Sequence, residues 1–272
     1  MSVFMADHVT DFCLEHIFDC GQCFRWNRQE DGTYLGIAGG RPARIGFSEN
    51  NVLVEDGIRE SNPDFWRKYL DLDRDYGRVK DHLAQRDAVL NKAMAFGYGI
   101  RILQQDLWET IVSFIISQNN HIPRIKGCIE RLAASFGEEV GTFYDRRWYN
   151  LPAPEILSAL TEEDLAPIKL GYRAKYLIQT AKQVCQRGLP ENREELLRLC
   201  GVGPKVANCI ALFGLGDYAS FPVDVWVGRV MNRLYGMEEK NRQQIEAYAQ
   251  KTYGELGGFA QQYLFYYIRE NH

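Results

Sequence analysis

The segment EELLRLCGVGPKVANCIALFGLGDYASFPVDVWVGRVMNRLYG, from Glu194 to Gly236, decides the fold of the region around it. It predicts a helix, a tight glycine turn, a second helix opened by Pro204, and a loop that leads into a third helix. In the turn, Gly201, Val202 and Gly203 leave backbone amides uncovered at a helix start, where a phosphate can approach. We therefore predict a hairpin that holds the phosphate backbone of a nucleic acid without reading its bases.

Two charged residues follow this hairpin. Lys205 stands in the first turn of the second helix, where the positive end of the helix dipole disfavours an ammonium ion. We expect a lowered pKa and an amine able to attack a sugar carbon, although the position also fits a phosphate-binding charge. Asp224 begins the third helix, where an N-cap is the simplest role. A capping carboxylate stays ionised, so it can also stabilise positive charge on a sugar as its base departs.

The chain on either side of this segment predicts an α+β fold. Residues 12–60 contain the alternating stretches TYLGIAG, ARIGF and NVLVED between turn signals, which indicates an antiparallel β-sheet. Helical periodicity follows from Asn62-Pro63 onward. Later helices are expected over residues 154–159, 172–187, 193–199, 204–213, 225–235, 242–253 and 258–269. We therefore predict an antiparallel sheet domain with flanking helices over residues 1–97 and a mostly α-helical domain over residues 98–272.

Composition limits the classes of protein that fit. The net charge is −4, yet the region from Lys169 to Arg229 holds nine basic and five acidic residues, so a basic surface is expected there. The apolar stretches are too short to span a membrane, and the start lacks a signal-peptide layout. We expect an intracellular monomer.

The seven cysteines predict reduced thiols, and Cys20-Gly-Gln-Cys23 lacks the second ligand pair that a zinc site needs.

Short motifs along nearly the whole chain resemble one enzyme family. LCGVGPKVA and FPVDV resemble the helix-hairpin-helix and Gly-Pro-Asp signature of a DNA glycosylase superfamily. GQCFRW, SFIISQNNHIPRI, LGYRAKY and FAQQYLF resemble 8-oxoguanine DNA glycosylase, and their shared order makes the match specific. The short sheet region is similar to compact prokaryotic members. The resemblance implies base excision repair: 8-oxoguanine opposite cytosine is flipped out of duplex DNA and excised through a Schiff base on Lys205, with β-elimination at the abasic site.

The resemblance also assigns a pocket for the everted base. It implies that the Gly21 carbonyl accepts N7–H of the oxidised guanine, and that Gln261 bonds to the pairing edge. Phe265 and Cys209 would close the pocket on opposite sides of the ring. Trp226 replaces a histidine found in eukaryotic members, which affects the shape of the pocket and the contact with the 5′ phosphate.

A second group implied by the resemblance acts on the DNA left behind. Asn119 and Tyr172 would fill the vacated stack, while Arg124 and Arg173 would contact the widowed cytosine. No organic cofactor or side-chain metal site is expected. A Na⁺ or K⁺ ion is an option at the hairpin, through the carbonyls of Leu197, Leu199 and Val202.

Two alternatives remain open from sequence. One is a related glycosylase for another damaged or mismatched base. Members that act on adenine or oxidised pyrimidine usually carry an iron-sulfur loop, but no cysteine follows Cys209. Alkyl-base enzymes generally lack the hairpin lysine. The other alternative is a non-catalytic module that uses its hairpin only to hold DNA.

Overall fold

The computed structural model describes residues 1–271 and contains one large antiparallel sheet. The strand order is β1-β5-β4-β3-β2, with β1 at Ser2–Ala6, β2 at Trp26–Arg28, β3 at Tyr34–Ala38, β4 at Arg41–Ser48 and β5 at Asn51–Asp56. The three strands predicted from alternation are confirmed as β3, β4 and β5. The outer strands β1 and β2 were not predicted. β1 lies before the alternating stretches, and β2 is only three residues long.

The sheet packs its inner face against the short helices α1 (Leu14–Phe18) and α2 (Pro63–Tyr69). Trp66 of α2 is fully buried, and its indole N–H donates to Asp56 Oδ2 at 2.8 Å. Arg41 binds the same carboxylate at 2.7 Å, which pairs the buried charge. These contacts join α2 to the end of β5.

The rest of the chain is mainly helical, as predicted. Its α-helices are α3 (Tyr76–Arg86), α4 (Asn91–Phe96), α5 (Leu107–Ser117), α6 (Ile122–Phe136), α7 (Pro154–Ala159), α8 (Arg173–Arg187), α9 (Arg193–Leu196), α10 (Pro204–Ile210), α11 (Val225–Tyr235), α12 (Arg242–Thr252) and α13 (Gly257–Glu270). Short 3₁₀ turns occupy Ala88–Leu90, Ala166–Ile168 and Gly254–Leu256, and a π-helical turn, η3, follows α10 at Ala211–Leu215. A small hairpin of β6 (Glu139–Phe143) and β7 (Arg146–Tyr149) was not predicted. The seven later helices are all confirmed, with ends within three residues of the predicted ones.

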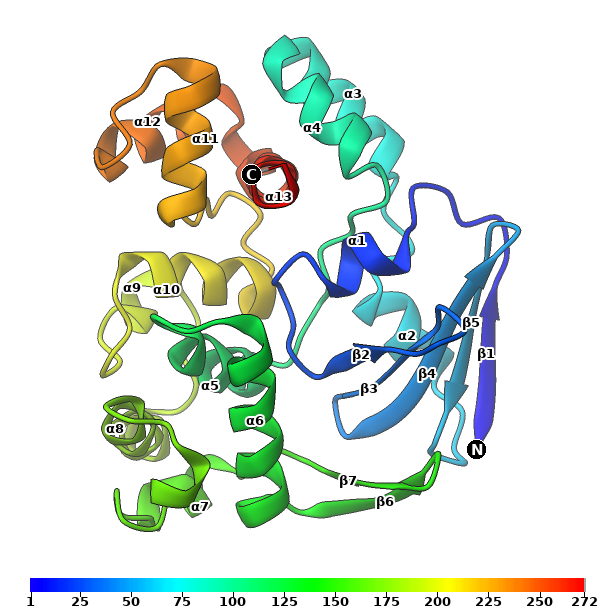
Figure 1. The fold of residues 1–272 in the computed structure, drawn as a ribbon, viewed down its shortest axis with the longest axis vertical. Helices are drawn as coiled ribbons and strands as arrows, with labels where there is room; N and C mark the ends of the chain where they lie inside the picture. The colour runs from blue at the N-terminus through cyan, green and yellow to red at the C-terminus, as the bar shows by residue number, and fades with distance from the viewer. Residues whose placement is uncertain (272) are drawn as a thin grey trace.

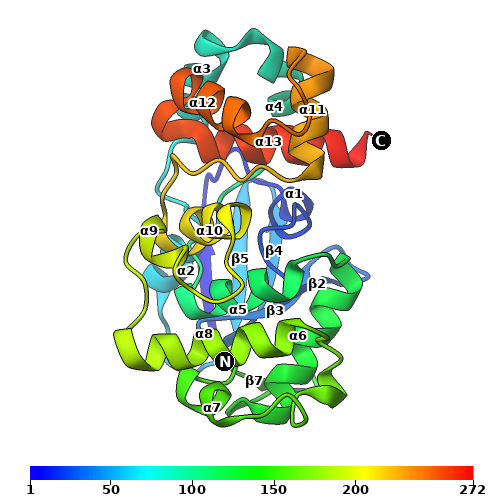
Figure 2. The same cartoon turned by 90° about the vertical axis from the view of Figure 1, so that its left-hand side faces the viewer.

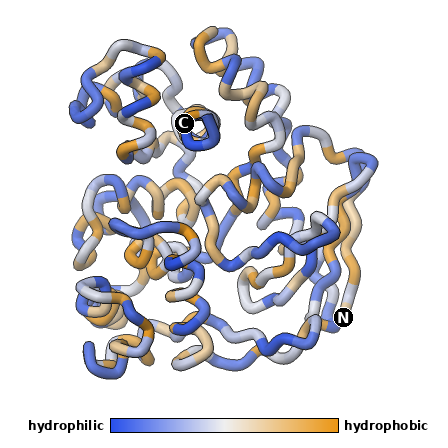
Figure 3. The backbone as a smooth tube through the Cα atoms, viewed as in Figure 1, coloured by the Kyte–Doolittle hydropathy of each residue, from blue (hydrophilic) through white to orange (hydrophobic). Residues whose placement is uncertain are grey.

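The helices enclose a core of their own around α5. Residues Thr110 to Ile116 of α5 are all buried, so this helix is covered on every side. Figure 1 shows the sheet on one side of the molecule and the helices beside and above it. Figure 2 shows α10 lying between α13 above and α5 below, and in Figure 3 hydrophilic residues predominate at the outer turns. Helices α3 and α4 lie within residues 1–97, yet their apolar side chains belong to the helical core.

The segment between α1 and β2 ties the sheet to the helical part. Gln22 is buried, donates to the carbonyl of Arg101 at 2.7 Å and accepts from Leu103 N at 2.9 Å. Arg25 is 2% exposed and donates to Glu130 of α6 at 3.1 Å and to the Tyr149 carbonyl at 2.7 Å. Four polar contacts therefore fix the loop that carries Gly21. Among residues 1–271, no helix is long and apolar enough to cross a bilayer.

Arg25→Ala should lower the free energy of unfolding by about 3 kcal/mol, because it removes a buried guanidinium and leaves the partly buried Glu109 and Glu130 without their counter-charge. Urea denaturation followed by tryptophan fluorescence measures this change. Arg28→Ala is the matched control: its ion pair with Glu15 is exposed on both sides, so a change under about 1 kcal/mol is expected. Equal effects of the two substitutions would contradict the bracing role of Arg25.

Candidate active site

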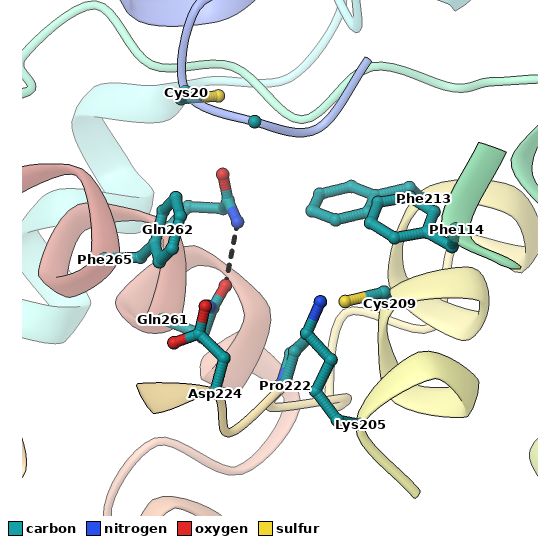
Figure 4. Close-up of a pocket in the computed structure, with 11 residues that line it drawn as sticks. Cys20, Phe114, Lys205, Cys209, Phe213, Pro222, Asp224, Gln261, Gln262 and Phe265 are labelled. Carbon is teal, nitrogen blue, oxygen red and sulfur yellow. Dashed lines mark hydrogen bonds between the residues drawn. The ribbon is translucent and has the colours of Figure 1, made fainter. Parts of the chain in front are cut away.

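A small cavity lies where the loop before β2 meets α5, α10, η3, the loop before α11, and α13. It combines apolar and aromatic side chains with a few polar groups, as small-molecule sites do. Figure 4 shows its lining. The residues are Cys20, Gly21, Phe114, Lys205, Cys209, Phe213, Pro222, Asp224, Gln261, Gln262 and Phe265.

Lys205 reaches the cavity from the first turn of α10, as predicted. Gly203 is the N-cap of this helix in extended backbone conformation, and Pro204 follows at the first helical position. The lysine side chain is half-buried and points toward the cavity (Figure 4). Cys209 lies one turn further along the helix and lines the same cavity. The ammonium nitrogen also lies 5.6 Å from the centre of the Phe114 ring.

The predicted lowering of the Lys205 pKa is wrong. Burial is the largest single influence and lowers the pKa, but Cys209 and Asp224 together raise it above the ordinary value. Burial has the opposite effect on a thiol, and it raises the pKa of Cys209. The amine must therefore lose a proton before it attacks.

Asp224 caps α11, as the sequence predicts. Its Oδ1 accepts from Val227 N at 2.8 Å, so one carboxylate oxygen is fixed by the helix start. The carboxylate points into the same cavity as Lys205 (Figure 4). The structure thus combines the capping role with a position facing the amine.

The four residues that the resemblance assigned to the sides of a base pocket also converge here. Gly21 has φ of +84°, so its backbone conformation favours glycine. Gln261 and Cys209 are buried, and Phe265 is half-buried. In Figure 4 Phe265 lies on the opposite side of the cavity from Cys209.

Several lining residues were missed by the sequence reasoning. Phe114 and Phe213 stack with their ring centres 5.5 Å apart and an interplanar angle of 12°. Phe213 follows Cys209 by one helical turn, and this spacing was a signal that could have revealed it. Gln262 was not predicted because the resemblance assigned a role only to its neighbour, Gln261. Cys20 also lines the cavity, and burial raises the pKa of its thiol to about 12. Among residues 1–271, no cluster of His, Cys, Asp or Glu could hold a metal ion.

Trp226 lies away from the other residues expected in the base pocket. It is half-buried near the start of α11, with the Arg229 guanidinium 4.9 Å from its ring. In the part of the chain that the structure describes, it is not one of the residues that line the cavity. A role in shaping the pocket would therefore act through the loop that holds Asp224.

The residues expected to contact the DNA stack surround the turn between α5 and α6. Asn119 is exposed with φ of +48°, and Tyr172 is 48% exposed. Arg124 is exposed and donates to the Lys169 carbonyl at 3.2 Å. Arg173 is instead buried, and it donates to the carbonyls of Gln118 and Asn119. In the DNA-free protein it braces this turn, so contact with a base would require those bonds to be exchanged.

The glycine turn adopts the predicted hairpin. Gly201 has φ of +77°, and a Cβ there would lie 2.4 Å from the Tyr176 ring, which excludes larger residues. Val202 is buried, whereas Gly203 is exposed with open space around it. Gln118 Nε2 donates to the Gly201 carbonyl at 2.9 Å and links the hairpin to the Asn119 turn.

Comparison with known proteins agrees with this geometry. Residues 5–111 match the family model of the 8-oxoguanine DNA glycosylase N-terminal domain, and residues 112–255 match that of HhH-GPD superfamily base excision DNA repair proteins. The N-glycosylase/DNA lyase of Saccharomyces cerevisiae is 32% identical over 266 residues, which cover 85% of this chain and 70% of the yeast protein. This chain belongs to the 8-oxoguanine DNA glycosylase/lyase family.

Solved structures of this family superpose over nearly the full length. The Clostridium acetobutylicum 8-oxoguanine glycosylase/lyase bound to double-stranded DNA, with cytosine opposite 8-oxoguanine, has 42% identity and a TM-score of 0.92. The match covers 98% of this chain and 95% of the clostridial one. The 3-methyladenine DNA glycosylase of Archaeoglobus fulgidus, at 19% identity and a TM-score of 0.73, shares the fold. The predicted enzyme class, a DNA N-glycosylase with lyase activity, is confirmed at the level of the family.

A raised Lys205 pKa predicts a pH-dependent nucleophile. Below that pKa, the neutral fraction of the amine rises about tenfold per pH unit. Borohydride trapping on an abasic-site duplex, measured in single turnover, should therefore accelerate from pH 6 to pH 8. Cys209→Ala removes a group that raises the pKa, so the rising limb should move to lower pH. Cys200→Ala, outside the cavity, is the control, and coincident profiles for Cys209→Ala and the unsubstituted enzyme would contradict the assignment.

Proposed function

We propose that this enzyme excises 8-oxoguanine paired with cytosine in double-stranded DNA and then cleaves the strand at the abasic site. The observation that carries the proposal is the convergence of Lys205, Asp224, Gly21, Gln261 and Phe265 on one small cavity. These residues come from segments far apart in the sequence. The DNA carried by the clostridial relative supports the same lesion and opposite base.

The chemistry follows from the two charged groups. Once deprotonated, Lys205 Nζ forms a bond to C1′ while the bond from C1′ to the base nitrogen breaks, and the electron pair of that bond leaves with the base. The ionised Asp224 stabilises positive charge that develops on the sugar before the new bond is complete. The bond from C1′ to the ring oxygen then breaks, and that oxygen takes up the proton released by the amine, so the sugar opens and the Schiff base forms. Removal of a C2′ proton then expels the 3′ phosphate by β-elimination.

Selection of the oxidised base rests on hydrogen bonding at Gly21. The lesion carries a donor, N7–H, where guanine carries an acceptor at N7, so the Gly21 carbonyl accepts from the lesion and opposes the normal base. An unpaired polar contact of this kind costs about 1 to 3 kcal/mol, or roughly 5- to 150-fold in binding. Gln261 bonds to the pairing edge, while Phe265 and Cys209 enclose the ring.

The exposed turn at Asn119 supplies the contacts with the remaining DNA. Asn119 and Tyr172 occupy the gap left by the everted nucleotide, and Arg124 with Arg173 bind the widowed cytosine. The hairpin at Gly201 to Gly203 holds the backbone phosphate. The enzyme acts as a monomer on duplex DNA inside the cell, in the cytoplasm if the source is prokaryotic, because that is where its substrate lies.

A Na⁺ or K⁺ ion at the hairpin is part of the proposal. The carbonyls of Leu197, Leu199 and Val202 follow the last turn of α9, where a helix leaves carbonyls without intrahelical partners. The Leu199 carbonyl accepts from Val202 N at 3.2 Å, and its second lone pair can bind a cation. Such an ion would stiffen the turn that meets the phosphate.

Lys205→Gln should abolish borohydride trapping with a duplex that contains 8-oxoguanine opposite cytosine, because no amine remains to form the Schiff base. Duplex binding should persist, since phosphate contacts are distributed over the hairpin. Gel shift and covalent-complex assays measure the two properties. Lys251→Gln, an exposed lysine of α12, is the control. Retained trapping in Lys205→Gln would refute the role of Lys205, and no trapping by the unsubstituted protein would favour a non-catalytic binding module.

Asp224→Asn should slow base release roughly 100-fold or more, with little loss of affinity, because an amide caps the helix but carries no charge. Single-turnover excision at saturating enzyme gives the rate. Asp106→Asn is the matched control: Asp106 caps α5 through the same kind of bond, 2.8 Å from Glu109 N, and does not line this cavity. Equal rates for Asp224→Asn and the unsubstituted enzyme would count against electrostatic stabilisation.

A further inference from the structure

Gln262 carries a buried hydrogen-bond acceptor beside the base cavity. It lies on α13 beside Gln261, is 3% exposed and lines the cavity. Its Nε2 donates to Gln261 Oε1 at 2.8 Å, the bond drawn as a dashed line in Figure 4. Its own oxygen, Oε1, has no hydrogen-bond partner within residues 1–271.

An unsatisfied buried oxygen is rare and destabilises the folded protein. The described residues contain three buried side-chain atoms of this kind: Gln262 Oε1, Tyr263 Oη and Arg269 Nη1. Of these three residues, only Gln262 lines the base cavity. A ligand that donates to this oxygen recovers the lost free energy on binding, so the unsatisfied acceptor favours one kind of ligand edge.

The two glutamines define which edge that is. Gln261 Oε1 accepts one bond from Gln262 and retains a second lone pair, while Gln262 Oε1 has both lone pairs free. The two glutamines therefore place two acceptors on the α13 side of the cavity. The pairing edge of a guanine-type base carries two neighbouring donors, N1–H and the 2-amino group. An adenine-type edge carries an acceptor at N1 and lacks the 2-amino group, so it leaves an acceptor unpaired.

We propose that Gln262 is a second specificity-determining residue, whose Oε1 accepts a hydrogen bond from the 2-amino group of the everted base while Gln261 accepts from N1–H. The inference rests on the proposed function, because it assumes that an oxidised guanine enters this cavity. The hydrogen bond between the two side chains holds Gln262 Oε1 in place before the base arrives, which reduces the entropy lost on binding.

The test compares two lesions, 8-oxoguanine and 8-oxohypoxanthine, each opposite cytosine. The second lesion lacks only the 2-amino group. Gln262→Met keeps the length of the side chain but removes the acceptor. We expect it to lower kcat/KM for 8-oxoguanine release roughly tenfold, and to leave release of 8-oxohypoxanthine within about twofold. The difference in base-pairing strength between the lesions affects both proteins equally and cancels when the two ratios are compared.

Cleavage of a preformed abasic site provides the internal control. No base is present there, so Gln262→Met should match the unsubstituted enzyme, which also shows that the variant folds. Gln243→Met, on the exposed surface of α12, controls for the substitution itself. If methionine is not accommodated, Gln262→Ala serves as the second variant.

The outcomes separate the two proposals. If the unsubstituted enzyme does not release 8-oxoguanine, the proposed function fails. If it does, and Gln262→Met preserves the preference for 8-oxoguanine over 8-oxohypoxanthine, the function stands and the role of Gln262 is overturned. An equal loss on both lesions also overturns it, because Gln262 would then act only by orienting Gln261.

Discussion

The opposition of an ammonium group and a carboxylate across one small cavity is the constraint on which the rest of the site depends. Lys205 comes from the start of α10 and Asp224 from the start of α11, so each is fixed by a helix end. Asn208 of α10 donates to the Phe221 carbonyl at 3.3 Å, which ties the Asp224 loop to the lysine helix. Cys209 and Asp224 also raise the pKa of the Lys205 amine.

The cavity also depends on a loop from the other part of the molecule. Gly21 belongs to the segment before β2, and buried contacts of Gln22 and Arg25 hold that segment against the helices. Arg269 of α13 donates to the Asp19 carbonyl and fixes the loop from the opposite side. A recognition carbonyl can discriminate between donors and acceptors only if its backbone cannot turn away, and these bonds supply that rigidity.

The polar lining shows how stability and recognition oppose one another. Gln262 Oε1 lacks a partner, and the raised pKa of Lys205 leaves its amine in the unreactive form. An unsatisfied buried acceptor costs stability, and a protonated amine cannot act as a nucleophile. Both groups lie beside the cavity that the proposed function assigns to the everted base.

The sequence by itself determined the fold class, the later helices, the hairpin, and the helix-start positions of Lys205 and Asp224, because caps, glycine turns and apolar periodicity are local properties. It did not predict β1, β2 or the β6–β7 hairpin, whose short strands depend on partners distant in the chain. Only the tertiary structure decided the sign of the Lys205 pKa shift, the burial of Arg173 and the open acceptor of Gln262. Each of these properties depends on neighbours that only folding brings together. The spacing of residues along the chain therefore cannot predict them.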